Sequence, residues 1–259
     1  MGSANIQGPL WSVAAQDWAT YQESAFLPLW RDALQAVHAQ EDMKILDAGC
    51  GAGGACVEAD KIGCETIGID ASSALLEIAR KRLPNVKFHE GDIESLPFDD
   101  SEFDAVIAVN SVLYAADITQ TMKEMARVIR PQGRIVITNW GKPEDCEVRD
   151  ILDAVVRILP FKPPKGPFWL SASGKLESLL EDVGFTVIES GETRCDFIYP
   201  SFEICWRAQR SAGPLQAAMK VLGEMRVYTA VEEVVKKYTD TSGAVVLRNR
   251  FIWVVGQLL

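Results

Sequence analysis

The segment Lys44–Gly54, with the sequence KILDAGCGAGG, constrains the fold more than any other part of the chain. It begins as a short apolar strand and runs into a glycine-rich turn, and residues 55–62 beyond the turn favour a helix. Glycine has no Cβ and tolerates positive φ, so such a turn lets the backbone approach a ligand closely. The N-terminus of the following helix offers unpaired N–H groups and a partial positive charge. This order of elements predicts the nucleotide-binding end of a doubly wound α/β sheet.

Two ligand classes fit the glycine turn. The spacing Gly49-x-Gly51-x-x-Gly54 satisfies the dinucleotide fingerprint, which is weak by itself. The spacing Asp47-x-Gly49-x-Gly51-x-Gly53 resembles motif I of the class I S-adenosylmethionine-dependent methyltransferases. This resemblance implies that the acidic residue lies near the methionine part of the cofactor. A carboxylate at the strand end suits an ammonium and a sulfonium group, whereas it is poorly placed against a diphosphate.

A second apolar strand is predicted at residues 65–70 and ends in Asp70, 21 residues beyond Gly49. A carboxylate at this position can accept hydrogen bonds from both ribose hydroxyls of an adenosine ligand. The same acid serves NAD and S-adenosylmethionine, so it does not choose between them. Ser72 and Ser73 are candidates for the N-cap of a helix that extends through Leu83.

Two later segments also resemble the methyltransferase family. Residues 90–98, EGDIESLPF, follow a predicted strand at 85–89 and match the family segment Gly-Asp-apolar-x-x-Leu-Pro-Phe. The resemblance implies that Asp92 meets the exocyclic amine of adenine and that the backbone N–H of Ile93 meets a ring nitrogen. Beyond a strand at 103–110 and a helix at 118–129, residues 130–134 match the family phrase Arg-Pro-x-Gly-basic. The resemblance therefore covers residues 43–139, and an NAD-dependent oxidoreductase would not require these segments.

The alternation of strands and helices predicts an α/β fold with right-handed crossovers. We expect a Rossmann-like, doubly wound, seven-stranded and mostly parallel sheet with helices on both faces. Residues 135–138 form its fifth strand, residues 185–190 another, and residues 244–256 the last, which the resemblance makes antiparallel. Further helices are expected in two pieces over 14–39, interrupted near Pro28, and at 202–210 and 215–237.

A chain of 259 residues is long enough for one large domain with a lid. Residues 1–42 are expected to form an N-terminal helical cap and residues 43–259 the methyltransferase domain. Insertions at about 141–172 and 199–240 are expected to form a helical lid over the carboxyl ends of the strands, where such folds bind ligands.

The composition of the chain limits the classes of molecule that it is expected to bind. The net charge of −10 argues against nucleic acid and anionic membrane, so a small-molecule acceptor is expected. The six cysteines form no Cys-x-x-Cys pair and only two histidines are present, so no metal site is expected. The N-terminus lacks a secretory signal and no apolar run reaches about 18 residues, which favours a cytoplasmic protein with reduced thiols. Whether the chain is a monomer or a homodimer stays open.

The resemblance and the strand ends together give a set of candidate site residues. The predicted cofactor contacts are Trp18, Tyr21, Asp47, Gly49, Cys50, Gly51, Gly53, Asp70, Ala71, Asp92, Ile93 and Asn110. The candidates for the acceptor pocket are Tyr114, Asn139 and Trp140, and the lid candidates are Trp169, Tyr199 and Trp206, although hydrophobic packing explains each equally well. Many relatives carry a histidine after strand four, but this chain has Tyr114-Ala115-Ala116, so no general base is assigned.

The expected activity is transfer of a methyl group from S-adenosylmethionine to an oxygen, nitrogen or carbon atom of a small molecule, leaving S-adenosylhomocysteine. Such a transfer is an in-line displacement in which alignment and exclusion of water are the enzyme's main tasks. Two alternatives remain: a non-catalytic protein that binds S-adenosylmethionine, whose cofactor site would look identical, and an NAD-dependent oxidoreductase.

Overall fold

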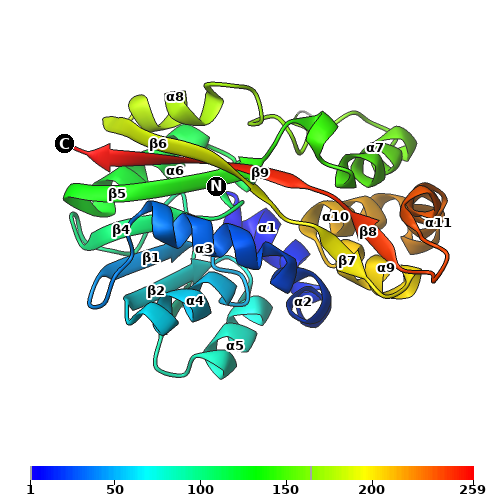
Figure 1. Cartoon of the computed structure of the whole chain (residues 1–259), viewed down its shortest axis with the longest axis horizontal. Coiled ribbons are helices and arrows are strands. Elements are labelled where there is room, and N and C mark those ends of the chain that lie inside the picture. The colour runs from blue at the N-terminus through cyan, green and yellow to red at the C-terminus, as the bar shows by residue number, and fades with distance from the viewer. Residues whose placement is uncertain (1, 164) are drawn as a thin grey trace.

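A computed structural model describes residues 2–163 and 165–259 of the chain. A seven-stranded sheet with the order β3-β2-β1-β4-β5-β9-β6 forms its middle layer (Figure 1). Strands β1 to β5 pair in parallel, and β9 runs antiparallel between β5 and β6. The predicted fold, a mostly parallel sheet with an antiparallel last strand, is therefore confirmed.

The strands are β1 Lys44–Ala48, β2 Glu65–Asp70, β3 Lys87–Glu90, β4 Phe103–Ala108, β5 Ile129–Trp140, β6 Phe185–Arg194, β7 Phe197–Tyr199, β8 Val245–Leu247 and β9 Arg250–Leu258. The α-helices are α1 Ala4–Ser12, α2 Ala15–Asp17, α3 Leu27–Ala36, α4 Gly54–Ile62, α5 Ser73–Arg82, α6 Ile118–Val128, α7 Val148–Ile158, α8 Lys175–Glu181, α9 Phe202–Arg210, α10 Gly213–Leu222 and α11 Glu224–Val235. A π-helical turn at Trp18–Gln22 and a 3₁₀ turn at Glu23–Phe26 join α2 to α3.

The central strands are apolar because both faces of the sheet are covered. In β1, Leu46 packs in a core cluster with Met122 and Met125 of α6. Its neighbour Ile45 faces the other side, where α3 and α4 supply residues such as Leu34 and Ala59 (Figure 1). Successive side chains of a strand point to opposite faces, so a strand buried on both faces is a continuous apolar run.

The N-terminal segment differs from its prediction. The cap expected over residues 1–42 begins with a helix, α1, at Ala4, before the two helical pieces predicted over 14–39. Pro28 does not interrupt a helix but stands in the first turn of α3, where a missing N–H costs no intrahelical hydrogen bond.

Two other predicted elements have different bounds in the structure. The expected helix over 215–237 is two helices, because Gly223 at φ 79° and ψ 150° ends α10 and precedes α11. Strand β5 begins at Ile129, before the predicted 135–138, and within it Gln132 has a left-handed φ of 67°. The neighbouring Gly133 has no room for a side chain, since a Cβ there would lie 2.9 Å from the carbonyl oxygen of Asp104.

The expected last strand, residues 244–256, is split in two. Its first part, β8, pairs with β7 in a separate two-stranded sheet, and only β9 joins the main sheet. The β7–β8 pair and helices α7 and α9–α11 lie beyond the end of the main sheet at which β5 finishes (Figure 1).

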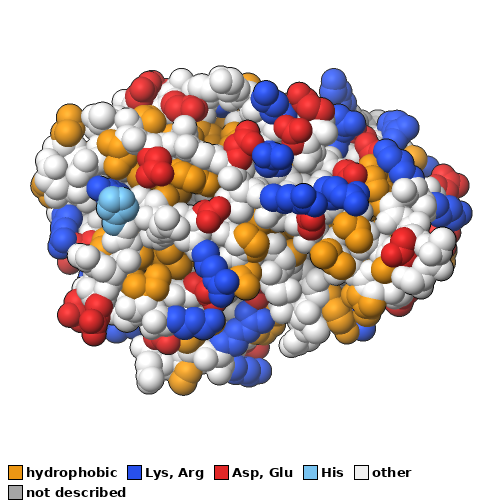
Figure 2. Space-filling model, viewed as in Figure 1, with side chains coloured by type: hydrophobic (Ala, Val, Ile, Leu, Met, Phe, Trp, Pro, Cys, Tyr) orange, Lys and Arg blue, Asp and Glu red, His pale blue; other side chains and the backbone are white. Residues whose placement is uncertain are grey.

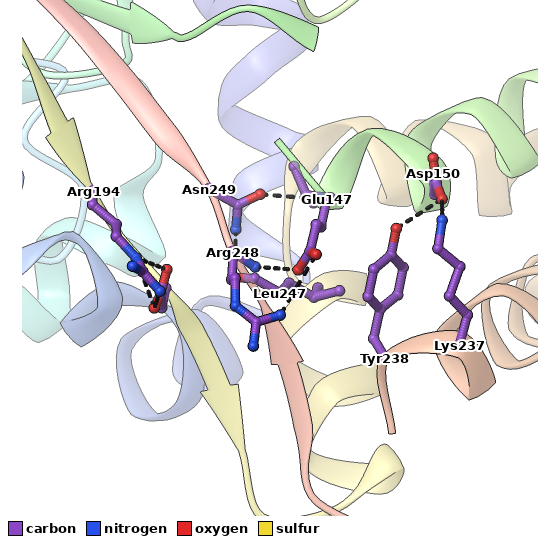
Figure 3. A network of polar contacts seen from close by, with 10 residues as sticks. Glu147, Asp150, Arg194, Lys237, Tyr238, Leu247, Arg248 and Asn249 are labelled. Carbon is purple, nitrogen blue, oxygen red and sulfur yellow. Dashed lines mark hydrogen bonds and ion pairs between the residues drawn. The ribbon is translucent and has the colours of Figure 1, made fainter. Parts of the chain in front are cut away.

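Polar contacts join α7 and the residue before it to the end of α11 and to the turn between β8 and β9 (Figure 3). Asp150 of α7 accepts hydrogen bonds from Lys237 and, at 2.7 Å, from the hydroxyl of Tyr238, just beyond α11. Between β8 and β9, the backbone N–H of Arg248 donates to Glu147 at 2.6 Å and Asn249 Oδ1 accepts from the N–H of Val148 at 3.0 Å. Segments that are far apart in the sequence are therefore held together on this side of the molecule.

On the face seen in Figure 2, acidic and basic side chains are interspersed. Ion pairs in the structure include Arg194–Asp196 and Arg250–Glu192. Within the described residues, every helix is too short or too polar to cross a bilayer.

Candidate active site

The turn after β1 has the geometry that its glycines suggest. Gly49, Gly51 and Gly53 have φ values of 87°, 56° and 83°, in the left-handed region that disfavours a Cβ. The backbone N–H groups of Gly49 and Cys50 donate to the carbonyl oxygen of Ile69 at 2.8 and 3.0 Å. These bonds fix the turn beside the carboxyl end of β2. Gly49 also approaches the segment after β4 closely, since a Cβ there would lie 2.4 Å from the Cβ of Ser111.

Asp70 ends β2 and is bound to the turn. Its Oδ2 accepts a hydrogen bond from the N–H of Gly51 at 2.8 Å, and its Oδ1 accepts from the N–H of Ser72 at 2.8 Å. Burial raises the pKa of Asp70 from its ordinary value, although the backbone hydrogen bonds act in the opposite direction. Each carboxylate oxygen keeps a further lone pair, so this group can accept two more donors from a ligand.

A cavity with about 890 Å³ of empty space, partly open to solvent, lies over the turn and the ends of the strands. Nine of the predicted cofactor residues line it: Trp18, Gly49, Cys50, Gly51, Asp70, Ala71, Asp92, Ile93 and Asn110. The structure thus brings together residues from segments far apart in the sequence.

The other three predicted cofactor residues do not line this first cavity. Asp47 is 2% exposed beneath the turn, where its Oδ2 accepts from the Sγ of Cys56 at 3.3 Å. Gly53 faces Ala79, with which a Cβ would be in contact at 3.1 Å. The ring of Tyr21 lies against Arg207, at 4.5 Å from its guanidinium carbon.

Three carboxyl groups, those of Asp47, Asp70 and Glu23, lie at or beneath the first cavity. Burial raises the pKa of Asp47 to about 7; the hydrogen bond from Cys56 lowers it, and the nearby charges of Asp70 and Glu23 raise it. Glu23, which the sequence did not suggest, lines the cavity and pairs with Arg82. Burial raises the pKa of Glu23 despite this partner. A cationic ligand above these carboxyl groups would favour their ionised forms, because an opposite charge close by lowers the pKa of a carboxyl group.

Helix α1, which the sequence also did not reveal, forms a wall of the first cavity with Ser3, Ala4, Gln7 and Trp11. The N–H of Ala4 donates to Asp92 Oδ2 at 3.1 Å and the N–H of Ser3 donates to Glu94 Oε1 at 3.0 Å. Carboxylates stabilise the N-terminus of a helix because they satisfy its free N–H groups and oppose its dipole. Asp92 therefore holds α1 in place as well as lining the cavity.

A second cavity adjoins the first and has about 510 Å³ of empty space, again partly open to solvent. The two share five wall residues: Trp11, Trp18, Phe26, Asn110 and Tyr114. The rest of its wall comes mainly from α7, β7, α9 and α10 and includes Val148, Leu152, Phe197, Ala208 and Leu215.

Two of the three predicted pocket residues lie at the second cavity. Tyr114 lines both cavities and Trp140 lines the second. Asn139 lines neither, because its Nδ2 donates to the carbonyl oxygen of Trp140 and to Ser171 Oγ, each at 3.2 Å.

The three lid candidates lie outside both cavities. Trp169 donates its indole N–H to the carbonyl oxygen of Leu113 at 3.3 Å. Trp206 packs edge-on against Tyr228, with ring centroids 5.2 Å apart. Tyr199 is 1% exposed and hydrogen-bonded to two glutamines. Their large side chains serve packing, which the sequence alone could not distinguish from a ligand contact.

Among the described residues, no histidine lines either cavity and no group of His, Cys, Asp and Glu could hold a metal ion. His89 packs against Phe98, with ring centroids 5.1 Å apart. Burial raises the pKa of Tyr114 well above its usual range, so its hydroxyl stays protonated at neutral pH. The site can align two small ligands more readily than it can remove a proton.

Comparison with known proteins agrees with this geometry. Residues 46–137 match the family described as methyltransferase domain. The demethylmenaquinone methyltransferase of Chlorobaculum parvum is 40% identical over 104 residues, which are 40% of this chain and 43% of that protein. The methyltransferase GfsG of Streptomyces halstedii is 33% identical over 201 residues, 70% of this chain and 68% of GfsG. For several other curated relatives the match spans about half of their length.

The fold is also that of solved methyltransferases. A crystal structure of a SAM-dependent methyltransferase from Aquifex aeolicus superposes with a TM-score of 0.53 and 17% identity, over 68% of this chain and 90% of that one. At this identity the likeness concerns the fold alone. Taken with the match to GfsG over two thirds of its length, these findings show that the chain belongs to the class I S-adenosylmethionine-dependent methyltransferase family.

Proposed function

We propose that this protein transfers the methyl group of S-adenosylmethionine, bound in the first cavity, to a small molecule in the second, leaving S-adenosylhomocysteine. The observation that carries this proposal is the shared wall of the two cavities, formed by Trp11, Trp18, Phe26, Asn110 and Tyr114. A donor and an acceptor on the two sides of this wall can meet, as an in-line displacement requires.

The residues of the first cavity fit the parts of the cofactor. Asp70 is placed to accept the ribose hydroxyls, and the glycine turn leaves room for the backbone to approach the amino-acid part. Asp92 and Ile93 line the side assigned to adenine. The acidic charge of Asp47, Asp70 and Glu23 favours a ligand with ammonium and sulfonium groups.

When bound, S-adenosylmethionine supplies an already activated methyl group, so the chain's own task is to orient the acceptor and to exclude water. Trp11 and Trp18 stand edge to face with ring centroids 4.9 Å apart at the shared wall, where aromatic faces favour a cation. Tyr114 contacts Trp11 at 5.4 Å between ring centroids, and its protonated hydroxyl can donate a hydrogen bond to the acceptor.

The organisation of the chain follows from which elements line the cavities. Residues 1–42 act as a cap, since α1 and Trp18 close the first cavity. The insertions at about 141–172 and 199–240 act as a lid, since α7, α9 and α10 line the second cavity. The acceptor is a small molecule, in keeping with a partly open cavity of about 510 Å³ and with the name of the C. parvum relative.

Calorimetry with three ligands tests the proposal. S-adenosylmethionine and S-adenosylhomocysteine are expected to bind, and NAD is not. A panel of small acceptors is then assayed for formation of S-adenosylhomocysteine. Binding of NAD alone would make the glycine turn a dinucleotide loop, whereas cofactor binding without turnover on any acceptor would favour a non-catalytic protein.

A further inference from the structure

The wall of the second cavity is almost entirely apolar. Among the described residues that line it, none carries a charge, and the amide side chains are Gln22, Asn110 and Gln209. An ion in this cavity would lose its hydration without gaining a counter-ion, which is costly. The cavity therefore favours an uncharged ligand, and its few polar groups decide which one.

Gln22 and Gln209 are joined by a hydrogen-bond chain through Tyr199. Gln209 Nε2 donates to the hydroxyl of Tyr199 at 2.8 Å, and this hydroxyl donates to Gln22 Oε1 at 2.5 Å. Gln209 Nε2 also lies 3.3 Å from Gln22 Oε1. The three side chains are 3%, 5% and 1% exposed for Gln22, Gln209 and Tyr199. Because the hydroxyl of Tyr199 accepts from Gln209 and donates to Gln22, this chain of hydrogen bonds runs in one direction, from Gln209 to Gln22.

That direction leaves two polar atoms unused. In the part of the chain that the structure describes, Gln22 Nε2 and Gln209 Oε1 have no hydrogen-bond partner. Neither atom is fully enclosed by protein, so a ligand can reach both. Both residues line the second cavity. Buried polar groups nearly always have a partner, so a donor and an acceptor left open at a cavity point to a ligand.

The elements that carry the two glutamines are also held together by other contacts. Gln22 ends the π-helical turn Trp18–Gln22, a conformation that is frequent at functional sites. Just before this turn, Asp17 accepts from Arg207 at 2.6 Å and from Arg210 at 3.0 Å, both on α9 beside Gln209. The turn and α9 therefore stay together when the glutamines are changed, which allows the pair to be tested by substitution.

We propose that the methyl acceptor is an uncharged, largely apolar molecule with a hydroxyl group, and that Gln22 and Gln209 hold this hydroxyl. A hydroxyl can accept from Gln22 Nε2 and donate to Gln209 Oε1 at once, whereas a carbonyl satisfies only the first atom and a carboxylate repels the second. This inference rests on the proposed function, because it assigns the occupant of the acceptor cavity.

The test uses apolar scaffolds of several sizes, each in three forms: unsubstituted, hydroxylated and carboxylated, for example naphthalene, 2-naphthol and 2-naphthoate. Binding to the full chain is followed by quenching of tryptophan fluorescence, since Trp11, Trp18 and Trp140 line the cavity, with and without S-adenosylhomocysteine. In wild type, the hydroxylated form of at least one scaffold is expected to bind about five- to tenfold more tightly than the unsubstituted form.

Gln22→Met and Gln209→Met are each expected to abolish this preference without changing the affinity for S-adenosylmethionine. Gln216→Met is the matched control, since Gln216 is equally buried on the neighbouring helix but bonds to the carbonyl oxygen of Arg210 and lines neither cavity. Thermal unfolding shows that each variant is folded.

Equal binding of hydroxylated and unsubstituted forms, tighter binding of the carboxylates, or no binding of any hydroxylated scaffold would overturn the inference. A preference that survives in both glutamine variants would do the same. Failure of the wild-type protein to bind S-adenosylmethionine would be a separate result. It would contradict the proposed function, but the preference of the second cavity for a hydroxyl group could still be measured.

Discussion

At the scale of single residues, Asp70 is bound to the glycine turn and is proposed to bind the ligand. Its carboxylate is fixed by two backbone N–H groups and still faces the first cavity. Asp70→Ala is expected to weaken binding of S-adenosylmethionine by about 1.5–3 kcal/mol, the usual value of hydrogen bonds to a charged group. Calorimetry measures this loss, and Glu90→Ala, at the exposed end of β3, is the control. Unchanged affinity in Asp70→Ala would remove this residue from the site.

Asp47 lies beneath the glycine turn, and its ionisation is expected to make the stability of the folded protein depend on pH. Its pKa in the folded protein, about 7, is raised above its ordinary value of 3.8 by burial. As pH rises from about 4 to about 7, the unfolded chain loses this proton first, so the stability of the folded protein falls across that range.

Asp47→Asn is expected to remove this fall while keeping an oxygen that accepts from Cys56. The variant should gain about 2–4 kcal/mol relative to wild type between pH 4 and pH 8. Denaturant unfolding at several pH values measures the difference. A difference between the two proteins that does not change with pH would show that Asp47 titrates normally.

At the scale of elements, helix α1 depends on contacts with two loops. Gly8 packs so closely that a Cβ would lie 2.3 Å from the carbonyl oxygen of Ala71, and the N-terminus of the helix is held by Asp92 and Glu94. Gly8→Ala is expected to displace α1 and to weaken cofactor binding, with an overpacking cost of about 1–3 kcal/mol. Calorimetry and limited proteolysis of the N-terminus report the two effects. The control is Gly166→Ala, which should behave as wild type because a Cβ at this position has nothing within 4 Å. Unchanged cofactor binding in the Gly8→Ala variant would show that α1 is not needed for the site.

The sequence revealed the elements whose signals are local. The glycine turn and the acid that ends β2 are encoded within a few residues, because positive φ and a strand-end carboxylate each need a particular residue type. Helix α1 contains Gly8 and Pro9, both poor helix formers, and is held by contacts with residues more than 60 positions away. The three-residue strands β7 and β8 are likewise too short for a pattern. Trp169 and Trp206 show the same limit of sequence-based prediction at the site, since the sequence does not distinguish an aromatic residue that packs in a core from one that lines a pocket.

At the scale of the whole molecule, Asp150 joins α7 to the end of α11, two segments of the proposed lid (Figure 3). Asp150→Ala is expected to raise hydrogen exchange in α7 and α11 without affecting β1 or β4. Global stability should change by no more than about 1 kcal/mol, since partly exposed ion pairs contribute little. Hydrogen-exchange mass spectrometry checks this prediction. Glu192→Ala, which removes an exposed pair at Arg250, is the control; equal exchange in all three proteins would show that the insertions move independently.

The central claim concerns how the two cavities meet, and a crystal structure of the protein with S-adenosylhomocysteine tests it most directly. We expect the ribose at Asp70, the adenine between Asp92 and Ile93, and the sulfur atom facing the shared wall at Asn110 and Tyr114. A sulfur atom turned away from the second cavity, or a ligand bound elsewhere, would contradict the account.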